Sequence, residues 1–217
     1  MRSKRIAAVL TVVGTCLVGG FAATGPSQAA TTPAPKVIHL IQARAGTVVP
    51  LAIGQGDDLW EAIPMFSAPH TNAYYVGLAE PGDGQSIADI CTVTVNNVVW
   101  YMTLERNGEA GDHYADTATF FQAGELKYDR PVGSCSSAGF STSISGNVAL
   151  TSAPYANTFY VGTYHIGDNL RAICEITDPG NVYWYLMLDL NGYAGDHFAD
   201  TAGWVVANDY VSTPSCN

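Results

Sequence analysis

A stretch of twelve residues occurs twice in this chain of 217 residues. Residues 107–118 read NGEAGDHYADTA and residues 191–202 read NGYAGDHFADTA, so ten of the twelve positions are identical. Trp100 and Trp184 share the same offset of 84 residues. A fixed internal period means that one supersecondary unit recurs, so the sequence predicts two homologous repeats of about 80 residues each.

The first 29 residues are typical of a secretory signal peptide. Three basic residues lie within the first five positions, an apolar run extends from Ile6 to Phe21, and small residues then suit cleavage before Ala30. The alternative is a lipoprotein signal at Cys16, although Thr15 precedes it and apolar residues follow. No later apolar run approaches the ~20 residues that a membrane span needs. We therefore expect a soluble, secreted, extracellular protein.

Removal of this leader makes the chain strongly acidic. Three of the nine basic residues leave with it, so six basic and nineteen acidic residues remain, a formal net charge of −13. Such a surface repels nucleic acids and anionic wall polymers. Nucleic acid is therefore excluded as a partner. The alternative meaning of the acidity is that it keeps a secreted protein soluble.

Four cysteines remain after the leader, and the repeat selects one of their three possible pairings. Cys91 and Cys135 are 44 residues apart, while Cys174 and Cys216 are 42 apart. Each repeat therefore carries its own pair, and export places both pairs in an oxidising compartment. We predict the disulfides Cys91–Cys135 and Cys174–Cys216, which leave no free thiol for catalysis.

The remaining chain divides into an N-terminal extension at 30–57, a first β repeat at 58–140 and a second at 141–217. Short β-branched and aromatic runs, separated by Gly, Asn and Pro, predict an all-β fold of two small barrels or sandwiches. The Ser- and Gly-rich stretch 133–146 suits a linker between them. The expected strands include 73–77, 86–95 and 98–104 in the first repeat, with counterparts at 158–162, 169–176 and 182–190.

The N-terminal extension contains two apolar runs, 37–42 and 47–53, that have no counterpart before the second repeat. They could complete the sheet of the first repeat, remain disordered, or form an arm that adds as a strand to another protein. So many apolar side chains in a secreted protein must be buried somewhere. The candidate partner-binding residues of this arm are Val37, Ile38, Leu40, Ile41, Arg44, Val48, Val49, Leu51 and Ile53.

The repeated twelve residues favour a structural excursion between two strands. Each copy begins with Asn-Gly, whose residues tolerate positive φ in tight turns. Asp112 and Asp196 could cap the short turns that follow them. The alternative is a metal site, for which the weak candidates are Asp112, His113, Asp116, Asp196, His197 and Asp200.

Metal binding and catalysis both receive limited support from these residues. Calcium takes six to eight oxygen ligands and would need backbone carbonyls as well. Zinc usually needs more His or Cys than one copy supplies. Catalysis would need converging groups with shifted pKa values, and no activated nucleophile motif is present. We therefore expect no cofactor and no enzymatic activity.

The second repeat resembles the bacterial SH3-like family. It reads GDNLRAIC at 167–174, Trp-Tyr at 184–185 and AGWVVANDYV at 202–211, which is similar to the Gly-Asp, Trp-bearing strand and closing Gly-Trp-Val of that family. The resemblance implies a small barrel that binds wall peptide or sugar, for which outward aromatic side chains offer contact area. The first repeat has Thr-Phe-Phe at 119–121 instead, so wall-ligand residues do not carry over.

A second resemblance concerns the layout of the chain. A strand-forming arm before cysteine-paired β units is similar to the adaptor subunits of actinobacterial umbrella toxin particles. Those subunits link other proteins and have no activity of their own. The sequence thus favours a secreted adaptor that binds other secreted proteins. A cell-wall or glycan-binding module is the alternative, and a metal-assisted enzyme is the third possibility.

Overall fold

The computed structural model describes residues 40–42, 56–81, 87–108, 114–128, 130–178, 180–192, 198–207 and 213–216. These residues form strands, turns and irregular connections without any helix, which confirms the predicted all-β class. Nothing within these ranges is a helix that could span a bilayer. The expected signal peptide lies outside the described residues and stays a prediction.

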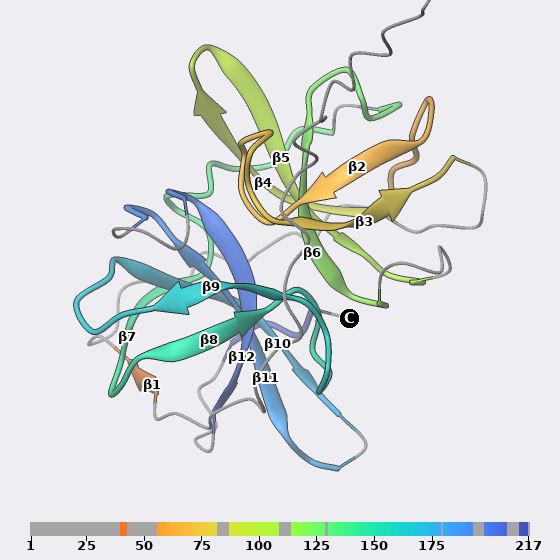
Figure 1. The fold of residues 1–217 in the computed structure, drawn as a ribbon. Coiled ribbons are helices and arrows are strands. Elements are labelled where there is room, and N and C mark those ends of the chain that lie inside the picture. The colour runs from red at the N-terminus through yellow and green to blue at the C-terminus, as the bar shows by residue number, and fades with distance from the viewer. Residues whose placement is uncertain are drawn as a thin grey trace, which may run out of the picture.

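Two sheets correspond to the two repeats, as Figure 1 shows. The first sheet has the strand order β3-β2-β6-β5-β4 and the second has the order β1-β7-β10-β11-β12-β8-β9. Each of the strands β2 to β6 corresponds to the strand six numbers later, from β8 to β12. Matched in this way, the two orders coincide, and β7 and β1 are additions at the end of the second sheet. Both repeats therefore share one topology. The strands are β1 (Leu40–Gln42), β2 (Ile63–Phe66), β3 (Tyr75–Ala79), β4 (Ile87–Val95), β5 (Val98–Glu105), β6 (Thr117–Gln122), β7 (Phe140–Ile144), β8 (Val148–Thr151), β9 (Tyr160–Tyr164), β10 (Leu170–Thr177), β11 (Tyr183–Asp189) and β12 (Thr201–Ala207).

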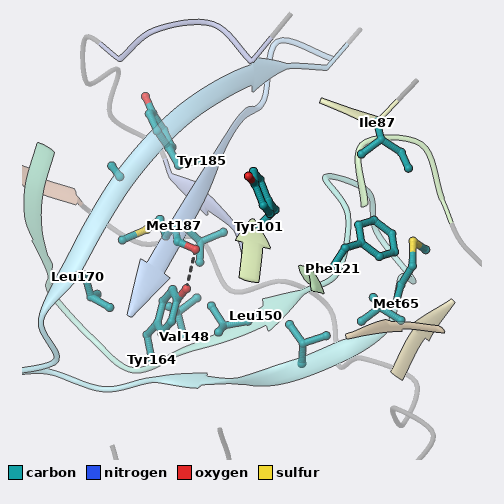
Figure 2. Packing of buried hydrophobic residues seen from close by; sticks show 14 of the residues in the cluster. Met65, Ile87, Tyr101, Phe121, Val148, Leu150, Tyr164, Leu170, Tyr185 and Met187 are labelled. Atoms are coloured by element: carbon teal, nitrogen blue, oxygen red, sulfur yellow. Dashed lines mark hydrogen bonds between the residues drawn. The ribbon is translucent and has the colours of Figure 1, made fainter. Parts of the chain in front are cut away.

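The central strands are buried on both faces, which explains why they are apolar at nearly every position. Along β11, Trp184 and Leu186 belong to one apolar cluster, whereas Tyr185 and Met187 belong to another. Each cluster takes residues from both repeats. Figure 2 shows one of them, with Phe121 of the first repeat in the same cluster as residues of the second. The two repeats therefore pack together rather than standing apart.

Backbone hydrogen bonds join the repeats in a reciprocal way. The amide of Ala202 donates to the carbonyl of Ser67 at 2.8 Å, and the amide of Ala118 donates to the carbonyl of Ser152 at 2.9 Å. These two bonds connect equivalent positions, since Ser67 matches Ser152 and Ala118 matches Ala202. Each repeat thus uses the start of its central strand β6 or β12 to bind the chain that leaves β2 or β8 of the other. The arrangement is a pseudo-twofold pairing within one chain.

One further contact between the repeats has no symmetric counterpart. The indole nitrogen of Trp204, a side chain with 0% exposure, donates to the carbonyl of Asp116 at 2.9 Å. The equivalent position in the first repeat is Phe120, which has no N–H to donate. The closing Gly-Trp-Val segment of the second repeat therefore stabilises the joint between the repeats.

Both predicted disulfides are present. Cys91 bonds to Cys135 with a Cα–Cα distance of 4.9 Å, and Cys174 bonds to Cys216 at 5.1 Å. In each repeat the first cysteine follows a β-bulge, and the segment around the second cysteine runs parallel to the same strand. Each bridge ties the C-terminal part of its repeat to β4 or β10. Closing a loop of this length contributes roughly 3–4 kcal/mol on the chain-entropy model.

Two expectations about segment boundaries need correction. The stretch 133–146 is not only a linker, because Phe140–Ile144 within it forms β7, with alternating buried and exposed residues. The strand of the N-terminal extension does not join the first sheet, because β1 pairs with β7 of the second. Leu40 of β1 is 6% exposed and packs in the shared apolar cluster.

The contact made by Trp204 leads to a testable prediction. Trp204→Phe removes the indole N–H and leaves the Asp116 carbonyl without that partner, so unfolding should become easier by about 1–3 kcal/mol. Trp184→Phe is the matched control, because the indole N–H of Trp184 donates within its own repeat, to the Asp178 carboxylate at 3.5 Å. Denaturant unfolding measures both variants, and equal losses would contradict a special role for Trp204 at the joint.

Candidate functional site

The repeated twelve-residue segments are the site that the sequence singled out, and the structure describes the two ends of each. Residues 107–108 and 114–118 are described in the first repeat, as are 191–192 and 198–202 in the second. Asp112, His113, Asp196 and His197 lie outside the described residues. Of the weak metal candidates, the structure therefore places only Asp116 and Asp200.

Each segment closes on itself at its glycine. Gly108 and Gly192 have φ values of +59° and +51°, as expected for the Asn-Gly pairs. A Cβ on Gly108 would lie 2.2 Å from the amide nitrogen of Ala115, and one on Gly192 would lie 2.1 Å from that of Ala199. The backbone at the start of the segment thus touches the backbone at its end, and only glycine fits there. The structural excursion that the sequence favoured has a geometric cause.

Buried acidic side chains anchor the start of each segment. The Glu105 carboxylate at the end of β5 accepts hydrogen bonds from the amides of Asn107 at 2.9 Å and Gly108 at 2.6 Å. In the second repeat, Asp189 accepts one from the amide of Asn191 at 3.2 Å. Both carboxylates have 0% exposure. Their charge therefore serves the local turn and is not presented to solvent.

The end of each segment is a tight turn into the next strand. The hydroxyl of Thr201 accepts from the amide of Phe198 at 3.0 Å and donates to the carbonyl of the same residue at 2.5 Å. Thr117 makes the same pair of bonds with Tyr114 in the first repeat. Asp116 and Asp200 complete this turn.

Asp116 and Asp200 occupy the same backbone position but differ in their electrostatics. Both have a left-handed backbone, with φ values of 58° and 60°. Burial raises the pKa of both carboxyls, and for Asp200 the nearby Asp189 raises it further, to about 6. Asp116 is partly compensated, because the Arg106 guanidinium lies 3.3 Å away and lowers its pKa. Arg106 has no counterpart in the second repeat, where the equivalent residue is leucine.

The segments also carry aromatic side chains into contact with the opposite repeat. Phe198 stacks on His70 with ring centroids 4.7 Å apart, and Tyr114 lies 6.4 Å from Tyr155. These two contacts are symmetry equivalents, because His70 and Tyr155 both follow an Ala-Pro pair in the turn after β2 or β8. The Tyr114 hydroxyl additionally donates to the Asn157 carbonyl at 3.3 Å. The C-terminal end of each segment therefore contacts the other repeat.

The described geometry suits packing between the repeats. In the described ranges, no group of three or more His, Cys, Asp or Glu side chains gathers in a way that could hold a metal ion. Since four of the six weak candidates lie outside those ranges, metal binding stays a prediction without a test here. The described ends of the two segments make reciprocal contacts between the repeats.

The arm residues that the sequence proposed are described only in part. Leu40 and Ile41 belong to β1, and the side chain of Leu40 is buried in the shared cluster. The others, Val37, Ile38, Arg44, Val48, Val49, Leu51 and Ile53, lie outside the described residues. The arm's role in binding a partner stays a prediction.

One feature of the surface was missed by sequence reasoning. Trp60 is 65% exposed and Tyr128 is 60% exposed, and the cations of Lys127 and Arg130 lie over their rings at 5.9 and 5.1 Å. They lie on two short segments that pair through the bridge between Leu59 and Leu126. Alignment of the two repeats could have revealed it, because Trp60 matches Ser145 and so has no aromatic counterpart in the second repeat.

Comparison of the chain with protein-family models, with curated proteins and with solved structures found no match. The resemblances to SH3-like repeats and to umbrella toxin adaptors therefore stay predictions.

The closure of the segment at its glycine can be tested by substitution. Gly192→Ala places a Cβ against the backbone of Ala199 and also disfavours the positive φ, so it should lower the melting temperature by several degrees. Gly146→Ala is the matched control, because its Cβ would meet nothing within 4 Å. Thermal unfolding by circular dichroism measures both, and an unchanged Gly192→Ala variant would contradict the closure.

The raised pKa of Asp200 predicts a dependence of stability on pH. The folded state disfavours the ionised carboxylate, so this group destabilises the fold above about pH 6, and the penalty disappears as pH falls below its unfolded pKa near 4. Asp200→Asn should therefore stabilise the protein by roughly 1–2 kcal/mol at pH 7.5, after allowance for solvent screening. Asparagine also tolerates the left-handed backbone.

Unfolding of the parent and of Asp200→Asn at pH 7.5 and at pH 4 measures this difference in stability. The same measurements are repeated with calcium. The difference between Asp200→Asn and the parent should vanish at pH 4. Asp116→Asn is the control and should gain less, because it also removes the partner of Arg106. A calcium-dependent rise in the parent's melting temperature that Asp200→Asn abolishes would instead support the metal site.

Proposed function

We propose that this chain is a secreted, non-catalytic adaptor that links partner proteins in an extracellular assembly, through its N-terminal arm and its two β repeats. An assembly of the umbrella toxin type is the one that the layout of the chain favours. In this proposal the arm adds as a β-strand to a partner, and the paired repeats supply a stable body.

The single observation that carries the proposal is the behaviour of β1. Leu40–Gln42 pairs with a sheet edge to which it is not connected by a hairpin, and it buries Leu40 in an apolar cluster. β-Addition to a partner requires the same two interactions, because backbone pairing supplies affinity and alternate side chains enter pockets. In this proposal the arm segment pairs with the strand edge of a partner in the same way.

The use of the repeated segments supports a non-catalytic role. Their described ends are engaged in closing the loop and in contacting the opposite repeat. The two cysteine pairs are consumed as disulfides. The two disulfides are also what an oxidising, extracellular environment permits.

Deletion of residues 31–54 tests the adaptor function. The body should keep both disulfides and lose only a few degrees of melting temperature, because the described part of the deleted segment buries one leucine, which is worth about 1.5–3 kcal/mol. Recovery of the partner from culture medium, identified by mass spectrometry, should be abolished. Ile166→Asp is the control, because this exposed residue lies in the second repeat after β9. Undiminished recovery by the deleted form would contradict the proposal.

Binding to a wall glycan is the second candidate, and the exposed aromatic pair Trp60 and Tyr128 favours it. Aromatic faces exposed to this degree offer stacking surfaces for sugar rings. Sedimentation with purified cell walls tests this candidate. If walls retain the parent and Trp60→Ala abolishes retention, while deletion of the arm has no effect, the glycan-binding function is supported and the adaptor function is not.

A further inference from the structure

The outer edge of β7 has the features of a site that accepts a strand. Its inward residues Phe140 and Ile144 belong to the shared apolar cluster, while Ser141 and Ser143 between them are exposed. On one side β7 pairs with β10, and on the other side it pairs with β1. At this edge β1 therefore supplies the backbone pairing of β7 and adds Leu40 to the apolar cluster beside it.

The occupant of this edge is held by few contacts. β1 is paired at three positions, all on one side, whereas β7 is paired at three positions on each side, and β10–β11 and β11–β12 are each paired at seven. Along the chain β1 precedes the first sheet, whose first pairing within the described residues is the bridge between Asp57 and Ile87. The strand that covers β7 thus belongs to the extension of the first repeat and not to the second. Figure 1 shows β1 beside β7 at the border of the second sheet.

We propose that the outer edge of β7 is an exchangeable strand-acceptor site for the segment Leu40–Gln42. The arm docks there in cis, protects an edge that would otherwise pair with other chains, and leaves it by exchange with another copy of the same segment. Leu40 is the residue that specifies the register, because a slip by one position would turn it away from the apolar cluster.

This acceptor site has a consequence that rests on the proposed adaptor function. If a partner takes up the arm through Leu40 and Ile41, the arm must first leave β7, so docking in cis and binding in trans compete. The affinity for the partner is then reduced by the fraction of arms that are docked. The paired repeats would thus hold the arm in a defined place until a partner with a stronger acceptor edge removes it.

A labelled peptide that corresponds to residues 37–46 tests the acceptor site in the full mature chain. Leu40→Asp in the protein places a carboxylate in the apolar cluster, which weakens docking of its own arm and frees the edge. Fluorescence anisotropy should then show at least tenfold tighter peptide binding to Leu40→Asp than to the parent. The peptide that carries the same substitution should not bind. Ile166→Asp is the matched control in the protein and should behave as the parent.

A chain whose arm is cross-linked to β7 should bind no peptide, in contrast to Leu40→Asp. Positions 41 and 143 face each other in the β1–β7 pair, so Ile41→Cys combined with Ser143→Cys should lock the arm and abolish peptide binding. In the recovery experiment from culture medium, the locked chain should lose the partner that the parent recovers. Retention of the partner by the locked chain would contradict the competition.

Two results would overturn the acceptor site itself. One is a Leu40→Asp chain that keeps both disulfides and its near-ultraviolet spectrum but binds no peptide. The other is a cross-linked chain that binds the peptide as tightly as the parent does. If Leu40→Asp fails to fold, hydrogen exchange of the parent decides instead. Amides in β1 should exchange at least a hundredfold faster than those in β11, and equal rates would contradict an exchangeable strand. Because these readouts use only the arm peptide or the chain alone, they are independent of whether the adaptor function holds.

Discussion

The reciprocal contact between the two repeats is the constraint on which the rest of the structure depends. Ala202 bonds to Ser67 and Ala118 bonds to Ser152, so each repeat supplies a donor and an acceptor at equivalent places. Such self-complementary pairing is the rule for twofold dimers. Here one chain carries both halves. At its described ends, each twelve-residue segment closes onto its own glycine and reaches the opposite repeat with an aromatic side chain.

The differences between the repeats are as informative as their likeness. Arg106 compensates Asp116 in the first repeat, while leucine stands at the equivalent position of the second, where burial and Asp189 raise the pKa of Asp200. Trp204 donates across the joint where the first repeat has a phenylalanine. The second sheet gains β7 and β1, and the first repeat carries the exposed Trp60. Duplication thus supplies a stable body, and the features proposed for binding lie where the copies diverge.

Sequence reasoning predicted those parts of the fold that follow from repetition and local pattern. The disulfide pairs follow from equal spacing, and β4, β5, β10 and β11 follow from their apolar and aromatic runs. β7 was missed because its FSTSI sequence has serine and threonine at three of five positions, which also suits a linker. The pairing of β1 with the second sheet could not be predicted, because it joins segments about 100 residues apart and depends on tertiary structure and not on local sequence. The left-handed backbone of Asp116 and Asp200 suits aspartate, which adopts it more readily than most residues, but the sequence alone does not say which aspartate of each segment takes it.

The central claim is that the two repeats form one cooperative unit. Differential scanning calorimetry of the mature, oxidised protein tests this most directly, because it compares the calorimetric enthalpy with the van 't Hoff enthalpy of the same transition. A shared core and reciprocal contacts predict a single transition with a ratio of the two enthalpies near ~1. Two transitions, or a ratio near ~2, would mean that the repeats unfold independently and would contradict the account.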